Sequence, residues 1–99
     1  MLWWRKRPHA VEFRKTWGGA KSRKGFRIVL RRNHWVDYFD DGQSCSVFFE
    51  LMGKRHGLIL YRGDTRGFDG LSTEAKDRIF ANIVRGLEFL DWDIDLAPG

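Results

Sequence analysis

This sequence contains a single cysteine, two prolines and three histidines, and it has no long apolar run. Cys45 has no second cysteine to pair with, so an internal disulfide is excluded. One cysteine with scattered histidines also cannot supply a zinc site of the common cysteine-rich kinds. We therefore expect no bound metal, no cofactor and a reducing compartment, the cytoplasm. The scarcity of proline, with 42% hydrophobic and 31% charged residues, indicates a globular chain.

No stretch reaches the roughly 20 apolar residues that a membrane span needs, so no transmembrane segment is expected. A secretory signal is not expected either, because its basic start must be followed by about 7–15 apolar residues. Here Leu2-Trp3-Trp4 is followed at once by Arg5-Lys6-Arg7-Pro8. Tryptophan beside Lys and Arg is also typical of segments that lie at a membrane surface, and this alternative stays open.

Positive charge is concentrated at the start of the chain. Residues 1–32 hold eleven Lys or Arg and one acid, Glu12, whereas residues 33–99 hold seven bases and twelve acids. The net charge of +5 therefore hides two opposite surfaces. Ninety-nine residues fill one hydrophobic core, so we expect a single domain over 1–99, with a partly mobile segment over 1–25.

The strongest local signal is Asp41-Gly42 between two runs rich in β-forming residues, which predicts a hairpin with a two-residue turn. That turn pairs Asp40 with Gln43. One face of the hairpin is then apolar and predicted to be core: Val36, Tyr38, Cys45, Val47, Phe49 and Leu51. Further strands are expected at 10–17, 26–31 and 57–61, whereas the glycine-rich stretch 18–25 and the stretch 63–70 are expected to be loops.

From Leu71 the apolar period changes to about 3.6, which predicts an amphipathic helix capped by Ser72 and running to Leu90. Gly86 inside it indicates close backbone packing or an early helix end. The alternation of Asp91, Asp93 and Asp95 with apolar residues then predicts a final strand. The expected fold is α+β, in the order β-β-β-β-β-α-β. It has an antiparallel sheet of about five or six strands and one long helix on one face.

Two sets of residues are candidates for binding. The face opposite the core carries large aromatic residues, and an exposed aromatic face is typical of a contact or self-association surface. The candidates for protein contact are Trp35, Phe39 and Phe48, together with Arg62, Asp64 and Arg66 from the following segment. Bases interleaved with tryptophan can instead contact phosphates and stack on nucleobases. The candidates for nucleic-acid contact are Trp3, Trp4, Arg5, Lys6, Arg7, Lys21, Arg23 and Lys24.

No catalytic constellation is recognisable in the sequence. Cys45 falls on the predicted core face with no histidine or base beside it, so it reads as a small buried hydrophobe. His9, His34 and His56 fall in predicted turns, outside metal-ligand spacing of one another. We therefore expect a non-enzymatic protein that binds a protein partner or itself, with nucleic acid as the alternative.

One resemblance extends over residues 35–96. A hairpin, a strand and a long loop precede the helix sequence Leu71-Ser72-Thr73-Glu74-Ala75-Lys76-Asp77-Arg78-Ile79-Phe80-Ala81-Asn82-Ile83, which is followed by Leu87-Glu88-Phe89 and a last strand. This order resembles small immunity proteins of bacterial polymorphic toxin systems. The resemblance implies a non-catalytic protein that neutralises a toxin by binding it, and it carries over no functional residue.

Overall fold

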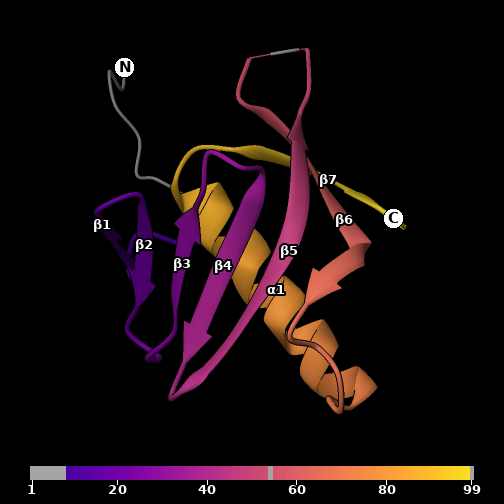
Figure 1. The fold of residues 1–99 in the computed structure, drawn as a ribbon. Helices are drawn as coiled ribbons and strands as arrows, with labels where there is room; N and C mark the ends of the chain where they lie inside the picture. The colour runs from indigo at the N-terminus through magenta and orange to yellow at the C-terminus, as the bar shows by residue number, and fades with distance from the viewer. Residues whose placement is uncertain (1–8, 54, 99) are drawn as a thin grey trace.

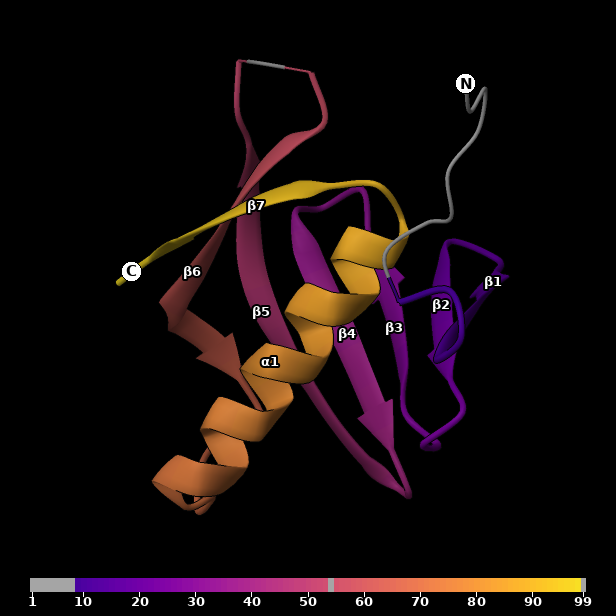
Figure 2. The same ribbon diagram turned by 180° about the vertical axis from the view of Figure 1, so that it is seen from behind.

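The computed structural model describes residues 9–53 and 55–98, which form one α+β unit of seven strands and one helix. The elements are β1 Phe13–Thr16, β2 Gly19–Ser22, β3 Arg27–Leu30, β4 Trp35–Asp40, β5 Gln43–Leu51, β6 Gly57–Arg66, α1 Thr73–Phe89 and β7 Asp93–Ala97. The strands form one curled sheet in chain order, and α1 lies diagonally across one face of it (Figures 1 and 2). We call the face toward α1 the inner face and the opposite face the outer face.

The core lies between the inner face and α1. Alternation along the strands turns Ile28, Val36, Val47, Leu58 and Leu60 inward, where each is fully buried. Ile83 and Leu87 of the helix pack against them. Within the described residues α1 is the only helix, and one long helix on one face is what the sequence predicts.

The central hairpin has the register that Asp41-Gly42 predicts. Asp40 pairs with Gln43, Tyr38 with Cys45 and Val36 with Val47, and both turn residues have positive φ. Five of the six predicted core residues of this hairpin are buried, but Leu51 is 58% exposed. That prediction was wrong because Leu51 is the last residue of β5, and the end of β5 and the start of β6 extend past the helix (Figure 2).

The helix begins and ends close to where its sequence predicts. The Ser72 hydroxyl accepts a hydrogen bond from the Ala75 backbone N–H at 3.1 Å, which satisfies one of the free donors of the first turn. Gly86 lies inside the helix and is buried against β3. A Cβ there would lie 2.6 Å from Ile28 Cδ1, so the first of the two expectations for Gly86, close packing, is confirmed.

We expect Gly86→Ala to lower the free energy of unfolding by about 1 kcal/mol, because overpacking, at about 1–3 kcal/mol, exceeds the gain in helix propensity. The clashing atom is the end of a side chain, and Ile28→Val removes it. Urea unfolding should therefore give the double variant a free energy of unfolding about 1 kcal/mol higher than the value expected from adding the effects of the two single substitutions. Strict additivity would show that Gly86 is not in steric contact with Ile28.

Three features differ from the sequence prediction. Residues 19–22, expected within a loop, form β2 between β1 and β3, and the sheet accordingly has seven strands in the described residues. β6 extends to Arg66, whereas a loop was expected from Gly63. Finally, β7 pairs with β6 in parallel, so the sheet is mixed rather than antiparallel. α1 returns the chain to the end where β6 began, and a strand that follows such a crossover runs parallel.

Candidate binding surface

Three aromatic side chains lie on the outer face of the sheet, where no described helix covers them. Trp35 and Phe39 come from β4 and Phe48 from β5, and all three are half-buried. We call them the aromatic trio. The rings of Trp35 and Phe48 meet edge to face with centroids 5.6 Å apart, and Phe48 also contacts Tyr61 of β6. Trp35 and Phe48 thus hold each other in place, whereas Phe39 lies four residues further along β4 and adds a separate ring to the same face.

Arginine side chains lie over two of these rings. The Arg66 guanidinium is 3.9 Å from the centroid of the Trp35 ring, and the Arg27 guanidinium is 4.8 Å from that of Phe39. Both distances fall within the range of cation–π attraction, about 6 Å. Stacking of this kind orients a guanidinium without neutralising it, so both arginines keep their charge for a partner.

The acidic groups in the middle of the outer face already have partners. The Asp37 carboxylate accepts hydrogen bonds from Arg31 Nε at 2.6 Å and from Ser46 Oγ at 2.7 Å. Glu50 accepts a hydrogen bond from the Tyr61 hydroxyl, and this bond raises the pKa of Tyr61. Arg31 therefore offsets the charge of Asp37, whereas Glu50 keeps its negative charge, because a neutral hydroxyl does not cancel it.

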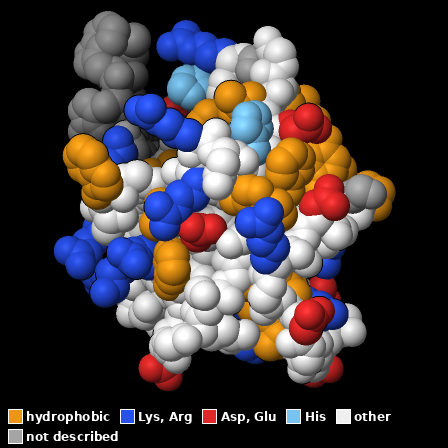
Figure 3. Space-filling view, viewed as in Figure 1, with side chains coloured by type: hydrophobic (Ala, Val, Ile, Leu, Met, Phe, Trp, Pro, Cys, Tyr) orange, Lys and Arg blue, Asp and Glu red, His pale blue; other side chains and the backbone are white. Residues whose placement is uncertain are grey.

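A row of three basic residues crosses the first three strands beside the trio. Arg14 of β1 is directly opposite Lys21 of β2, and Lys21 is directly opposite Arg27 of β3. Arg27 in turn is opposite Phe39, so the row ends at the aromatic trio. Lys and Arg side chains gather over these strands in Figure 3, which views the outer face. We call Arg14, Lys21 and Arg27 the basic row.

Two hollows run along this face. One, of about 650 Å³, is lined by the basic row, Phe39 and the turn of the β4–β5 hairpin. The other, of about 430 Å³, lies over Trp35 and Phe48 and is bounded by residues 63–66 of β6. Basic and aromatic groups therefore line two open hollows on one face of the sheet rather than a closed pocket.

The predicted protein-contact residues of β6 divide between the two faces. Arg66 joins the trio, and Asp64 lines the hollow beside it. Arg62 points to the inner side, where it donates to Asp77 of α1 at 2.8 Å and lies over the ring of Phe80. The structure thus does not bring Arg62 together with Trp35. The register between β5 and β6 shifts after Val47, and this irregularity accommodates the extra residues of β6.

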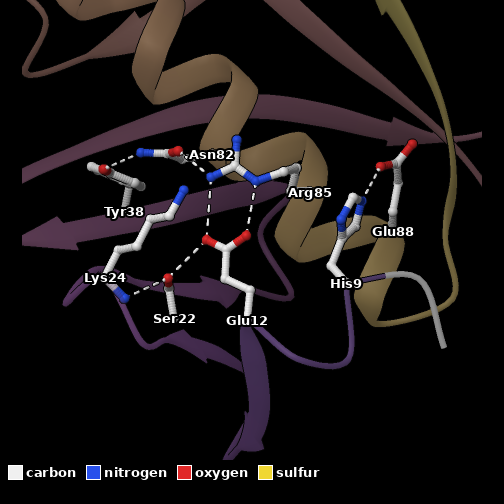
Figure 4. Close-up of polar contacts among 8 residues, drawn as sticks. All are labelled: His9, Glu12, Ser22, Lys24, Tyr38, Asn82, Arg85 and Glu88. Atoms are coloured by element: carbon white, nitrogen blue, oxygen red, sulfur yellow. Dashed lines mark hydrogen bonds and ion pairs between the residues drawn. The ribbon is translucent and has the colours of Figure 1, made fainter. Parts of the chain in front are cut away.

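The predicted nucleic-acid residues are also separated. Lys21 lies in the basic row, and Arg23 lines a neighbouring hollow with Arg14 and Lys21. Lys24 lies instead beside a polar network on the helix side (Figure 4). The remaining candidates, Trp3, Trp4, Arg5, Lys6 and Arg7, fall outside the described residues.

Arg14 and Arg27 are the binding candidates that the sequence did not single out. Their alternation along β1 and β3 was visible, because Arg14 and Arg27 occupy the polar positions of two short strands. The sequence did not predict that Arg14 and Arg27 lie on either side of Lys21. That arrangement requires β2 between β1 and β3, and residues 18–25 were expected to be a loop. The sequence indicated that positive charge is concentrated in the first third of the chain. The pairing of β1, β2 and β3 places three of these basic residues side by side.

Glu12, the single acid of the first 32 residues, fastens the N-terminal hairpin to the helix (Figure 4). Its carboxylate accepts hydrogen bonds from Arg85 Nε at 3.0 Å and Nη2 at 3.2 Å, and from Ser22 Oγ at 2.9 Å. Arg85 also donates to Asn82, whose amide donates to the Tyr38 hydroxyl at 3.0 Å. The hydrogen bond from Arg85 is the main cause that lowers the pKa of Glu12. This network positions β1 and β2, and therefore Arg14 and Lys21.

Other chemistry in the described residues is sparse. Cys45 is 4% exposed, as predicted, and burial raises the pKa of its thiol to about 11, so it is a thiol at neutral pH. The described part of the chain holds no group of three His, Cys, Asp or Glu residues able to bind a metal. Across residues 9–53 and 55–98, no helix has the length and apolar character to cross a membrane.

Comparison with protein-family models, with curated proteins and with solved structures finds no match for this chain. The resemblance of residues 35–96 to immunity proteins stays a prediction. A function for this chain is therefore inferred from the geometry of the outer face.

Proposed function

We propose that this chain is a non-catalytic binding protein and that the outer face of its sheet is the binding surface. The proposal rests mainly on the aromatic trio, which lies half-exposed on a face that no described element covers. Large aromatic groups with arginine stacked on them are enriched where proteins bind partners, because they provide contact area at a low cost in conformational entropy.

The two sets of candidates predicted from the sequence contribute to this one surface. Trp35, Phe39, Phe48 and Arg66 belong to the predicted protein-contact set, and Lys21 belongs to the predicted nucleic-acid set. Their common face supports one binding site with an aromatic half and a basic half, rather than two sites on separate parts of the molecule. An immunity role would be one case of such binding, with a toxin as the partner.

Capture from a lysate tests the use of this face. We expect Trp35→Ala with Phe48→Ala to reduce at least tenfold the molecules that the immobilised chain retains, because the variant loses the centre of the contact surface. Far-UV circular dichroism should show that the variant remains folded. The oligomeric state, measured by light scattering, tests whether the retained molecule is a second copy.

A matched control removes apolar surface elsewhere. Leu51 and Leu96 are exposed to 58% and 51% and lie outside the outer-face patch, so Leu51→Ala with Leu96→Ala should leave capture unchanged. The proposal fails if the Trp35 and Phe48 variant keeps both the capture and the oligomeric state of the unmodified protein.

A further inference from the structure

The basic row is a feature that the fold does not need. Like charges directly opposite one another on neighbouring strands destabilise a sheet, and strands lie only about 4.8 Å apart. Arg14, Lys21 and Arg27 are all exposed, and none of them forms an ion pair within the described residues. By contrast, Arg31, Arg62 and Arg85 each bind a carboxylate. Three adjacent unpaired cations are therefore available to an anionic ligand.

Two acids border the same hollow without pairing with the row. Asp40 and Asp41 line its far end, at the turn of the β4–β5 hairpin. Asp40 accepts a hydrogen bond from the Tyr38 hydroxyl at 3.3 Å, and Asp41 is exposed at the turn. The cations lie on strands β1 to β3 and the acids at the opposite wall, so the hollow has one positive side and one negative side.

The ligand must also suit the aromatic rings that adjoin the cations. A simple anion would use the row alone, whereas a chain of anions that carries flat rings would use both halves. Nucleic acid has this combination: phosphates suit a basic groove, and bases stack on aromatic side chains whatever their sequence. In a duplex the bases are already stacked inside and cannot reach the trio, so the fit is to a single strand.

One further aromatic residue belongs to the same hairpin as Arg14 and Lys21. Trp17 occupies the turn between β1 and β2 and is 98% exposed, the most exposed of the large apolar side chains described. It makes no ring contact that would hold it against the protein, among the contacts of the described residues. A fully exposed indole at the end of a basic hairpin offers a second place for a base to stack.

Resting on the proposed function, we propose that the outer face binds single-stranded nucleic acid. The basic row contacts phosphates, and the aromatic trio stacks on bases. Arg27 joins the two halves, because it belongs to the basic row and its guanidinium lies over the ring of Phe39. Binding is expected to be tolerant of sequence, since the face offers stacking and charge rather than a set of fixed hydrogen-bond partners.

The test uses the full 99-residue chain and a fluorescent single-stranded 12-mer of thymidine or uridine, with anisotropy measured from 50 to 300 mM salt. Each phosphate contact on a single strand contributes about −0.7 to the slope of log affinity against log salt. Arg14→Gln with Lys21→Gln and Arg27→Gln should therefore reduce the slope by about 2 and weaken binding about 100-fold at 0.1 M salt. Trp35→Leu with Phe48→Leu should weaken binding at least fivefold and leave the slope unchanged.

The matched control is Lys15→Gln with Lys76→Gln and Arg78→Gln, which removes the same charge from positions outside the basic row. It should retain binding to within about threefold. The row variant should unfold at the same or a higher temperature than the unmodified chain, because it relieves repulsion between like charges. A loss of binding would then reflect lost contacts and not lost folding.

Several results would overturn the inference. They are equal affinities of the row and control variants, absence of oligonucleotide binding at 50 mM salt, and binding of a 12-base-pair duplex as tight as that of the single strand. Nuclease treatment of the lysate capture separates this inference from the proposed function. If no oligonucleotide binds and nuclease-resistant capture still depends on Trp35 and Phe48, the surface binds a partner other than nucleic acid, and only the nucleic-acid inference fails. If neither oligonucleotide nor lysate capture depends on the outer face, both fail.

Discussion

Gly19→Ala is expected to lower the free energy of unfolding by about 3 kcal/mol, the upper end of the usual range for overpacking. Gly19 is buried in β2 opposite Val29 of β3. A Cβ at this position would lie 1.8 Å from the Ile28 carbonyl oxygen and 2.9 Å from the Val29 Cα. Both are backbone atoms of the paired strand. The clash can be relieved only by moving β2 away from β3, which disturbs the packing of Ala20 and Phe13 as well.

Urea unfolding followed by far-UV circular dichroism measures this loss, and amide hydrogen exchange shows where it falls. Exchange should accelerate most in β1 and β2, because these strands are attached to the sheet through the disturbed pairing. Gly53→Ala is the matched control: an added Cβ meets no atom within 4 Å there, and stability should change by less than about 0.5 kcal/mol. If Gly19→Ala unfolds at the same urea concentration as the unmodified chain, the described pairing of β2 with β3 is wrong.

The same variant bears on binding. Lys21 lies two residues from Gly19 and is held between Arg14 and Arg27 only while β2 pairs on both sides. A displaced β2 breaks up the basic row without changing any of its side chains. Gly19→Ala should therefore weaken oligonucleotide binding, whereas the aromatic trio on β4 and β5 stays in place.

The elements predicted from the sequence are those that local signals specify. Asp41-Gly42 favours positive φ and so sets both the turn and the register of β4 with β5. The helix follows from an apolar period that persists from Ala75 to Leu87 and from the cap at Ser72. In both cases the decisive residues lie within a few positions of one another. Their effect therefore does not depend on the rest of the fold.

The elements that sequence reasoning missed depend on distant neighbours. Residues 19–22 contain glycine, alanine, lysine and serine and have little intrinsic preference for strand. They form β2 because β1 and β3 provide hydrogen-bond partners on both sides, and because Gly19 allows the close approach. The end of β6 was predicted to be part of a loop over residues 63–70, yet residues 63–66 belong to a strand whose register with β5 is irregular.

The binding surface was predictable in its parts but not in its arrangement. The aromatic trio followed from the alternation along the hairpin, and the excess of positive charge followed from composition. The basic row depends on the registers of β1, β2 and β3, and β2 was not predicted. Arg14 and Arg27 were also not among the predicted candidates. An ion pair between Glu12 and Arg85, 73 positions apart, likewise has no local signature.

Glu12→Gln is expected to lower the free energy of unfolding at pH 7 by about 1.5–3 kcal/mol, the usual contribution of hydrogen bonds to a charged group. The side chains of Glu12 and Arg85 are only 16% and 26% exposed, so the amide leaves a guanidinium without its counter-charge in a partly dry position. In a double-mutant cycle with Arg85→Met, the two effects should not add, because both remove the same pair. Asp77→Asn, which breaks the exposed pair with Arg62, is the control and should cost less than about 1 kcal/mol.

The pH dependence of this difference identifies the carboxylate as its source. The pKa of Glu12 in the folded chain lies below its usual value of 4.5, so the unfolded chain takes up a proton at Glu12 before the folded chain does. The stabilisation is therefore complete above about pH 5, and it is lost as the pH falls from 4.5 through the lowered pKa of the folded state. Glutamine does not titrate, so the gap between the unmodified chain and Glu12→Gln should close over this interval in urea unfolding. If the difference in the free energy of unfolding were the same at pH 7 and pH 3, the effect would come from packing. The charge of Glu12 would then not be what holds the N-terminal hairpin against α1.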